Sequence, residues 1–283
     1  MAKHTVEELE RIASQVRRDI IKMVNAAKSG HPGGSLGCAD FFVALYFHIL
    51  KHDPQHFSMD GINEDIFILS NGHISPGLYS VLARSGYFEK EELGSFRMID
   101  SRLQGHPSTL EGLPGIRIAT GSLGQGLSVA IGAAMSKKLN SDQRLVYCLL
   151  GDGELQEGQI WEAAMYAAGR EIDNLVVTID YNQKQIDGSL EDVLDLGDLP
   201  AKWESFGWKV LKMDGNNMRD VLETLELARA ETGKGMPVII IMHTEMGYGV
   251  DFMMGTHHWH GMPPNDEQAR EALAQLEETL GDY

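Results

Sequence analysis

The chain has 283 residues, of which 43% are hydrophobic and 23% charged, and a formal net charge of −17. This composition is typical of a folded protein with a large core rather than of a disordered chain. A surface this acidic repels the phosphate groups of nucleic acids and of anionic membranes. We therefore expect neither as a partner. The longest apolar run, Phe41–Phe47, is far shorter than the roughly 20 residues that cross a bilayer. We therefore expect a cytoplasmic protein whose two cysteines, Cys38 and Cys148, are reduced.

The first predicted element is a helix over Val6–Ala27. Its apolar side chains recur at helical spacing from Leu9 to Val24, and Gly30 and Pro32 end it. A short apolar run, Ile66–Leu69, follows as the first predicted strand.

The stretch from Gly121 to Met135 is helical in pattern but unusually rich in glycine, alanine and serine. Each helical glycine costs about 1 kcal/mol relative to alanine, so small residues are expected where something must approach closely. Tight internal packing, a subunit interface and a cofactor wall are all compatible with this pattern.

The most informative segment begins at the predicted strand Leu145–Leu150. It runs into Gly151-Asp152-Gly153-Glu154, then a helix around Glu157–Ala168, then the strand Leu175–Ile179, which leads to Asn182. Glycines at the carboxyl end of a parallel strand let the backbone approach a ligand, and the next helix directs its amino-terminal N–H groups to the same place. The segment therefore predicts an anion site at this edge of the sheet.

Asp152 and Asn182 follow neighbouring predicted strands and lie one strand–helix–strand unit apart, so their oxygens can converge. Carboxylate, amide and carbonyl oxygens are ligands suited to Mg²⁺ or Ca²⁺. No cysteine–histidine group has the spacing of a zinc site. A nicotinamide site is disfavoured because the third glycine of its Gly-x-Gly-x-x-Gly turn is replaced by Gln156.

The remaining elements complete an alternation of strand and helix. They are a strand over Val210–Met213, a helix over Met218–Ala230, a strand over Val238–Met242 and a helix over Asn265–Leu280 capped by Asn265. The alternation predicts an α/β fold, a doubly wound, mostly parallel sheet with helices on both faces. No repeat or linker interrupts it, so we expect one domain over residues 1–283.

Together, these motifs resemble a known family. The segment Gly151-Asp152-Gly153-Glu154 followed by Asn182 resembles the signature of thiamine diphosphate enzymes. Five further segments narrow the resemblance to the transketolases, in the family's order over about residues 5 to 263: Ser29–Gly34, Ser70–His73, Gly105–Pro107, Thr120–Gly126 and His257–Gly261. Ser122 departs from the family, in which many members have proline, although a backbone contact there would survive.

The resemblance implies thiamine diphosphate and Mg²⁺ as cofactors, with Ca²⁺ as a substitute for the metal. It implies metal ligation by Asp152, Asn182 and the backbone carbonyl of Lys184. It implies substrate contacts, and thus catalytic roles, for His31, His106 and His257, where His258 and His260 leave the choice within the last motif open. Cofactor contacts are implied for His73, Gly121, Leu123, Gly153, Asn182, Ile186 and His257.

Full transketolases are more than twice as long as this chain. The resemblance therefore implies a C-terminal partner subunit with the pyrimidine-binding domain and its activating glutamate, in a heterotetramer of two copies of each chain. The implied reaction moves a two-carbon ketol unit from a ketose, or its phosphate, to an aldose. Three alternatives remain: the α chain of a 2-oxo acid dehydrogenase, a transketolase-like subunit for a specialised sugar, and a non-catalytic binding module with the same fold.

Overall fold

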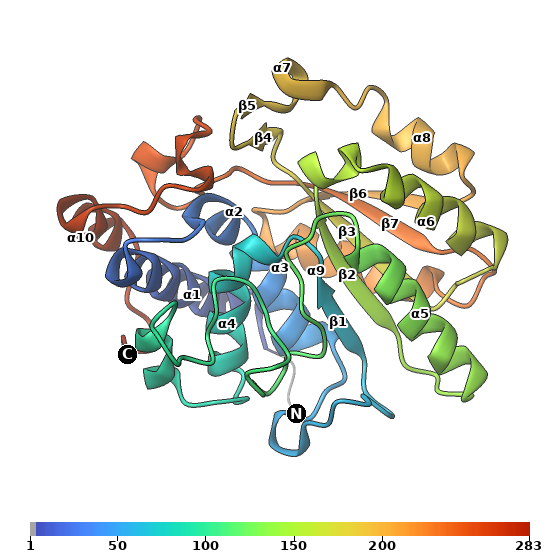
Figure 1. The fold of residues 1–283 in the computed structure, drawn as a ribbon, viewed down its shortest axis with the longest axis horizontal. Helices are drawn as coiled ribbons and strands as arrows, with labels where there is room; N and C mark the ends of the chain where they lie inside the picture. The colour runs from blue at the N-terminus through green and yellow to red at the C-terminus, as the bar shows by residue number, and fades with distance from the viewer. Residues whose placement is uncertain (1–3) are drawn as a thin grey trace.

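The computed structural model describes residues 4–283 and is built on a parallel sheet (Figure 1). Five strands lie in the order β1-β2-β3-β7-β6, and every neighbouring pair is parallel. Each strand matches one of the five predicted apolar runs to within two residues at either end. The strands are β1 (Ile66–Leu69), β2 (Val146–Gly151), β3 (Leu175–Tyr181), β6 (Lys209–Asp214) and β7 (Val238–His243). The predicted α/β class is confirmed.

Ten α-helices pack around this sheet in the described part of the chain. The helix α1 (Val6–Ala27) has the predicted bounds, and it begins with a capping box in which Thr5 and Glu8 bond each other's backbone N–H. The others are α2 (Pro32–Gly37), α3 (Ala39–Ala44), α4 (Ser75–Arg84), α5 (Gly126–Leu139), α6 (Gly158–Gly169), α7 (Leu190–Leu194), α8 (Leu199–Ser205), α9 (Met218–Glu231) and α10 (Asp266–Gln275).

Side chains along each strand alternate between two separate cores, which is why the predicted runs are apolar throughout. In β2, Tyr147 and Leu149 join the core beneath α1, α3, α4 and α9, whereas Val146, Cys148 and Leu150 join the core beneath α5, α6 and α8. The sheet is thus covered on both faces, as Figure 1 shows.

The strand order explains which helix covers which face. The chain moves from β1 to β2 to β3 and on to the edge strand β6 in one direction, and α5, α6 and α8 cover one face along that path. It then turns back to insert β7 between β3 and β6, so a right-handed connection puts α9 on the opposite face. The carboxyl ends of β2 and β3 lie side by side as a result.

Two predicted helix bounds are wrong. The pattern from Gly121 is not helical until Gly126, because Gly121 (φ 126°) and Gly124 (φ 84°) adopt left-handed backbone conformations. The last helix ends at Gln275 rather than Leu280, and the following residues instead lie along α1. Asn265 does cap that helix.

A short hairpin follows β3 and carries two predicted site residues. Its strands are β4 (Lys184–Gln185) and β5 (Gly188–Ser189), which pair antiparallel across Ile186 and Asp187. Within residues 4–283, no helix combines the length and apolar character needed to span a membrane.

Candidate active site

The predicted polar residues meet at the carboxyl edge of the sheet. Because Gly151 at the end of β2 pairs with Asp180 in β3, the residues that follow these strands, Asp152 and Asn182, emerge side by side. Both are buried, with 3% and 7% of their surface exposed. A single-turn helix, Gly153–Gln156, and then α6 start directly after Asp152.

A cavity of about 130 Å³ opens at this edge. Seven of the residues expected to bind cofactor or metal line it: His73, Leu123, Asp152, Gly153, Asn182, Lys184 and Ile186. Gly34, Asn71, Gly151, Glu154, Asp180, Gln185 and His260 complete its walls. The structure thus brings segments from across the chain to one place.

Backbone amides organise the carboxylate of Asp152. Its two oxygens accept hydrogen bonds from Gly153 N (2.7 Å) and Gln183 N (2.5 Å). Burial, with the neighbouring carboxylate of Asp180, nevertheless raises the pKa of Asp152 to about 8. Two acidic groups so close together, away from solvent, favour a bound cation.

The second carboxylate, Asp180, is also buried, and burial raises its pKa. It accepts hydrogen bonds from Asn182 Nδ2 (2.8 Å) and from the hydroxyl of Thr244. Since Asn182 Oδ1 accepts from the backbone N of Lys184 (2.9 Å), the amide of Asn182 is fixed in orientation. Asp180 therefore orients one predicted metal ligand and raises the pKa of the other.

The ammonium group of Lys184 does not neutralise this pair. It forms an ion pair with Glu245 at 3.1 Å instead. Across the described residues, no cluster of three or more His, Cys, Asp and Glu side chains has the arrangement of a metal site. A metal here would need the amide oxygen of Asn182, backbone carbonyl oxygen and ligand oxygens, which Mg²⁺ accepts.

Three polar atoms around the cavity are buried without a hydrogen-bond partner: Asn71 Oδ1, Gln185 Nε2 and His260 Nδ1. Buried polar groups are nearly always paired in native proteins, so unpaired ones facing a cavity point to a polar ligand. The mixture of an acceptor, a donor and an imidazole suits a phosphorylated, nitrogen-containing cofactor. The residues therefore fit a diphosphate and its divalent cation.

Three histidines from distant segments gather beside this cavity. The ring centroids of His31 and His73 are 5.0 Å apart, and that of His260 lies 6.0 Å from the first and 5.2 Å from the second. His257, the predicted member of the last motif, instead packs on His258 at 4.8 Å. The single turn His258–His260 thus turns the third histidine of the motif toward the site, and the role predicted for His257 stays a prediction.

These rings favour the neutral form. Burial, helped by neighbouring imidazoles and Arg97, lowers the pKa of His31 to about 4. Burial lowers the pKa of His73 and His260 as well. A neutral imidazole offers one donor and one acceptor, so it can exchange a proton with a hydroxyl group.

The fourth predicted histidine, His106, packs against Gly121. A methyl group at Gly121 would lie 2.6 Å from the His106 ring, and its φ of 126° excludes most other residues as well. Part of His106 is exposed to solvent. The burial of the rest of its ring, followed by the charge of Arg97, lowers its pKa. A predicted cofactor contact and a predicted substrate contact are therefore in direct contact with each other.

Comparison with known proteins decides the family. A family model described as the transketolase thiamine diphosphate binding domain matches residues 9–281. The chain belongs to the transketolase family.

Several transketolase relatives have nearly the same length as this chain, and we compare two that are named as subunits. One is the apulose-4-phosphate transketolase subunit of Actinobacillus succinogenes, to which the chain is 38% identical over 96% of this chain and 97% of the relative. The other is the 6-deoxy-6-sulfo-D-fructose transketolase subunit SqwG of a Clostridium species, with 37% identity over 95% and 96%.

Solved transketolases share the fold but are longer. The crystal structure of transketolase from Campylobacter jejuni superposes with a TM-score of 0.88 and 35% identity, covering 96% of this chain but 43% of that protein. The chain therefore corresponds to the amino-terminal, thiamine diphosphate-binding part of a transketolase.

One buried acid of this transketolase domain was not predicted as a site residue. Glu154 accepts hydrogen bonds from Gly124 N (2.8 Å), from Gly151 N (3.1 Å) and from the hydroxyl of Ser70. It thereby joins the glycine-rich loop before α5 to the loop after β2. Its place in the Gly151–Glu154 motif is the signal that could have identified it.

Asp180, Asn71 and Gln185 were also missed as site residues. Asn71 lies inside the motif Ser70–His73, and Asp180 directly precedes Tyr181-Asn182. A polar residue near the end of an apolar strand is a usable signal for both. Nothing in the sequence around Gln185 distinguishes it from an ordinary turn residue.

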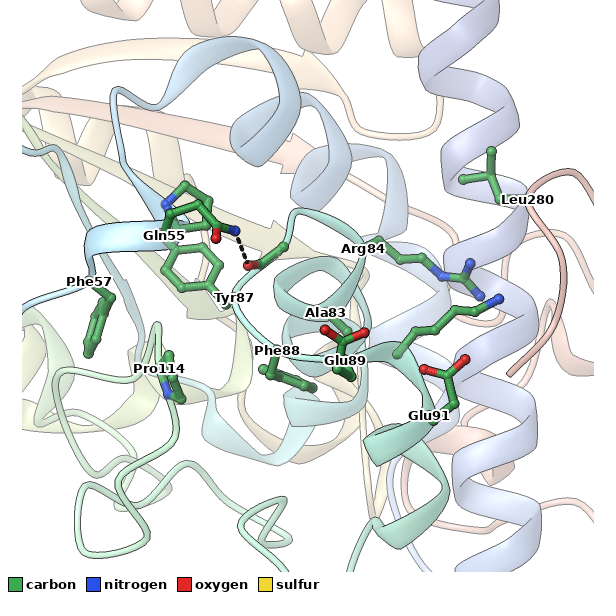
Figure 2. Close-up of a pocket in the computed structure, with 13 residues that line it drawn as sticks. Gln55, Phe57, Ala83, Arg84, Tyr87, Phe88, Glu89, Glu91, Pro114 and Leu280 are labelled. Carbon is green, nitrogen blue, oxygen red and sulfur yellow. Dashed lines mark hydrogen bonds between the residues drawn. The ribbon is translucent and has the colours of Figure 1, made fainter.

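A larger cavity, of about 800 Å³, lies away from the predicted site (Figure 2). Its two cations are already engaged, because Arg84 pairs with Asp19 at 2.8 Å and Lys90 Nζ lies 3.4 Å from the carbonyl oxygen of Gly281. Gln55 bonds the carbonyl of Gly86 across it. None of the predicted site residues lines it, so size alone does not locate the chemistry.

Proposed function

We propose that this chain is the thiamine diphosphate-binding subunit of a two-chain transketolase. With a C-terminal partner subunit, it transfers a two-carbon ketol unit from a ketose, or its phosphate, to an aldose acceptor. The observation that carries the proposal is the convergence of Asp152 and Asn182 with His31, His73 and His260 beside one cavity.

The size of this cavity supports a need for a partner. Small-molecule sites usually have volumes of roughly 300–1,000 Å³, whereas this one has about 130 Å³. Only part of the cofactor can be enclosed by this chain, and the pyrimidine-binding domain with the activating glutamate would enclose the rest. Three relatives of nearly equal length are named as subunits, which supports the same conclusion.

The metal and diphosphate would be held at the sheet edge. Asp152, Asn182 and the backbone carbonyl of Lys184 would ligate Mg²⁺, or Ca²⁺ in its place. Gly153 would meet the diphosphate through its N–H, which donates a hydrogen bond to the carboxylate of Asp152 in this structure. Gly121 and Leu123 would lie against the aminopyrimidine, and His73 and Ile186 would contact other parts of the cofactor.

Bound thiamine diphosphate supplies the carbon nucleophile for transfer of the two-carbon unit. The protein's own contribution is to place sugar oxygens against neutral imidazoles. His31 and His106 would each exchange a proton with a sugar hydroxyl group or accept a hydrogen bond from it. The third histidine in this role would be His257 or, because of its position beside the cavity, His260. The ring of His31 is partly buried, with its Nδ1 out of contact with solvent, and this burial lowers its pKa.

A second candidate function is ketol transfer to or from a specialised sugar. Relatives of nearly equal length that are named as subunits carry the names of unusual sugars, which are phosphorylated in one case and sulfonated in another. An anionic ketose of this kind is therefore proposed beside the common ketose phosphates.

We further propose a single domain over residues 1–283, two copies of each chain in the assembly and a cytoplasmic location. The location agrees with the state of Cys38 and Cys148, both of which are buried and unpaired.

The proposal is tested by reconstitution. The purified chain should transfer no ketol unit alone, and activity on ketose phosphates, apulose 4-phosphate or 6-deoxy-6-sulfofructose should appear when the partner is added. A coupled assay of aldehyde release measures it. Robust ketol transfer by the chain alone, free of any co-purified protein, would overturn the two-chain assignment.

The metal assignment is tested by Asp152→Ala. The variant should fold but lose Mg²⁺-dependent binding of thiamine diphosphate by at least about 100-fold in the reconstituted complex, because a charged ligand has been removed. Calorimetric titration with and without Mg²⁺ measures this, with Glu157→Ala, at the start of α6, as the control. Unchanged cofactor affinity would refute the assignment.

A further inference from the structure

One arginine side chain joins the two turns that carry His31 and His106. Arg97 Nη1 donates a hydrogen bond to Ser29 Oγ at 2.8 Å, and Nη2 donates to the carbonyl oxygen of Gly105 at 3.5 Å. Ser29 lies two residues before His31, and Gly105 directly precedes His106. The guanidinium group therefore spans both histidine turns, which are about 75 residues apart in the sequence.

The local structure holds this guanidinium closely. Arg97 has a φ of 58°, a left-handed backbone conformation that is uncommon for an arginine. Its backbone N donates to the carbonyl of Leu103 at 2.9 Å, which closes the intervening loop. A methyl group at Gly105 would lie only 2.6 Å from the guanidinium carbon of Arg97. The left-handed backbone of Arg97 and the close approach of its guanidinium group to Gly105 together indicate that the placement of this side chain matters.

The charge of Arg97 is not paired. No carboxylate within residues 4–283 forms an ion pair with it, and its Nε is buried without a hydrogen-bond partner. An arginine stays protonated even when burial lowers its pKa. The site therefore contains an uncompensated positive charge beside two imidazoles.

The charged and titratable groups around these imidazoles are few. His31 is faced by His73, His106 and His260 as well as by Arg97. His106 is faced by Arg97, His31 and His73, and the arginine is also near Tyr79. None of these groups is an acid that would offset the arginine, so its field opposes protonation of both rings.

We propose that Arg97 is a positioning residue for ketol transfer: it holds the two histidine turns in register and presents an unpaired positive charge to both imidazoles. A neutral imidazole can accept a proton from a sugar hydroxyl, whereas a protonated one cannot. The catalytic part of this inference rests on the proposed function, but the placement and the charge belong to this chain alone.

The charge is tested on the chain without any reaction. In Arg97→Gln, a histidine titration followed by NMR should show the pKa of His31 and His106 raised by about 0.5 unit or more. Arg97→Lys should keep both values low because the charge remains. Arg102→Gln is the control, since Arg102 lies on the same loop but is paired with Glu92 at 2.7 Å. Unchanged pKa values in Arg97→Gln would overturn the proposal.

The positioning is tested in the reconstituted complex. Ser29→Ala removes one bond to the guanidinium and keeps the charge, so kcat should fall about 10-fold without a shift in the pH profile. Arg97→Gln should lower kcat and also move the acidic limb of kcat/KM to higher pH. If Arg97 had only a structural role, Arg97→Gln would lower the thermal stability and leave the acidic limb of kcat/KM in place. This result would refute the proposal. If the wild-type pair transfers no ketol unit, the proposed function fails while the titration still decides the role of the charge.

Discussion

Two buried acids at the end of β2 and β3 illustrate how single residues combine function with cost. Asp152 and Asp180 are almost inaccessible to solvent, and burial raises the pKa of both carboxyl groups. Such a pair destabilises the ionised state of the free chain, because neither solvent nor a cationic side chain compensates a charge on either carboxyl group. A divalent cation would remove that cost on binding, so metal and cofactor should also stabilise the fold.

At the residue scale, Asp282 should be the acid that most stabilises the segment after α10. Its carboxylate accepts hydrogen bonds from Gln15 Nε2 and from two nitrogens of Arg18, all at 2.9 Å. These bonds, those from Arg18 first, hold the pKa of Asp282 well below its usual range. Because a carboxyl group in the unfolded chain has a pKa near 3.9, the stabilisation is complete above about pH 4 and is lost as the pH falls further.

Asp282→Asn should therefore lower the free energy of unfolding at pH 7 by about 1 kcal/mol, a value reduced by partial solvent exposure. The difference from the wild type should shrink below about pH 4. Denaturant unfolding at several pH values measures both effects. Glu278→Gln is the control, because its half-exposed carboxylate lies 3.7 Å from the same arginine, and it should cost only a few tenths of a kcal/mol. An Asp282→Asn deficit that stays constant down to pH 2 would contradict the assignment.

At the scale of elements, the start of α5 depends on one close approach. The backbone N of Gly126 donates to Ser70 Oγ at 3.1 Å, and a methyl group at this glycine would lie 2.8 Å from the Cα of Ser70. Ser70 belongs to the turn after β1, so the helix start and the sheet edge are packed backbone against backbone. The glycine is required by this contact, although glycine weakens a helix elsewhere.

Gly126→Ala should therefore destabilise the chain by about 1–3 kcal/mol, because the neighbouring backbone cannot move aside easily. Gly132 in the same helix is the matched control, since a methyl group there meets nothing within 4 Å. Gly132→Ala should raise the free energy of unfolding by about 0.5–1 kcal/mol through helix propensity. Thermal and denaturant unfolding of the isolated chain compare the two, and equal effects would refute the packing argument.

The elements also indicate what the sequence can and cannot predict. The five strands were predictable because a strand buried on both faces is a local apolar run. The start of α5 was not predictable, because Gly121 and Gly124 fit helical spacing yet adopt positive φ values. The end of α10 was not either, because the bonds that draw residues 276–283 onto α1 come from residues about 260 positions away.

The site shows the same division. Asp152 and Asn182 were predictable because strand ends place them, and topology follows from alternation of strand and helix. The orientation of the histidines was not, because a single turn, His258–His260, decides which ring of the last motif faces the cavity. The spacing of motifs along a sequence indicates which residues lie near one another in the fold. The direction of a side chain in an irregular loop depends instead on tertiary contacts.

At the scale of the whole molecule, one face combines exposed apolar side chains with a hollow. Helices α5 and α6 expose Val129 (43%), Met165 (61%) and Tyr166 (43%), and residues of both helices, Tyr166 among them, line a depression of about 360 Å³. Gly132 also lines this depression. Exposed apolar patches of this kind mark interaction surfaces, and the net charge of −17 opposes their pairing between identical chains at low salt.

We therefore expect the isolated chain to self-associate through this face when salt screens its charge. The Debye length falls from about 10 Å at 0.1 M to about 3 Å at 1 M, so association should increase over that range.

Met165→Glu should keep the chain monomeric and weaken assembly with the partner subunit by at least about 10-fold, because a charge is then buried in the contact. Met59→Glu makes the same change at a similarly exposed methionine (56%) on a distant loop, and it should behave like the wild type. Sedimentation velocity and a pull-down titration measure the two effects. If Met165→Glu associates as readily as Met59→Glu, another face forms the assembly, and the small-residue pattern of α5 reflects internal packing alone.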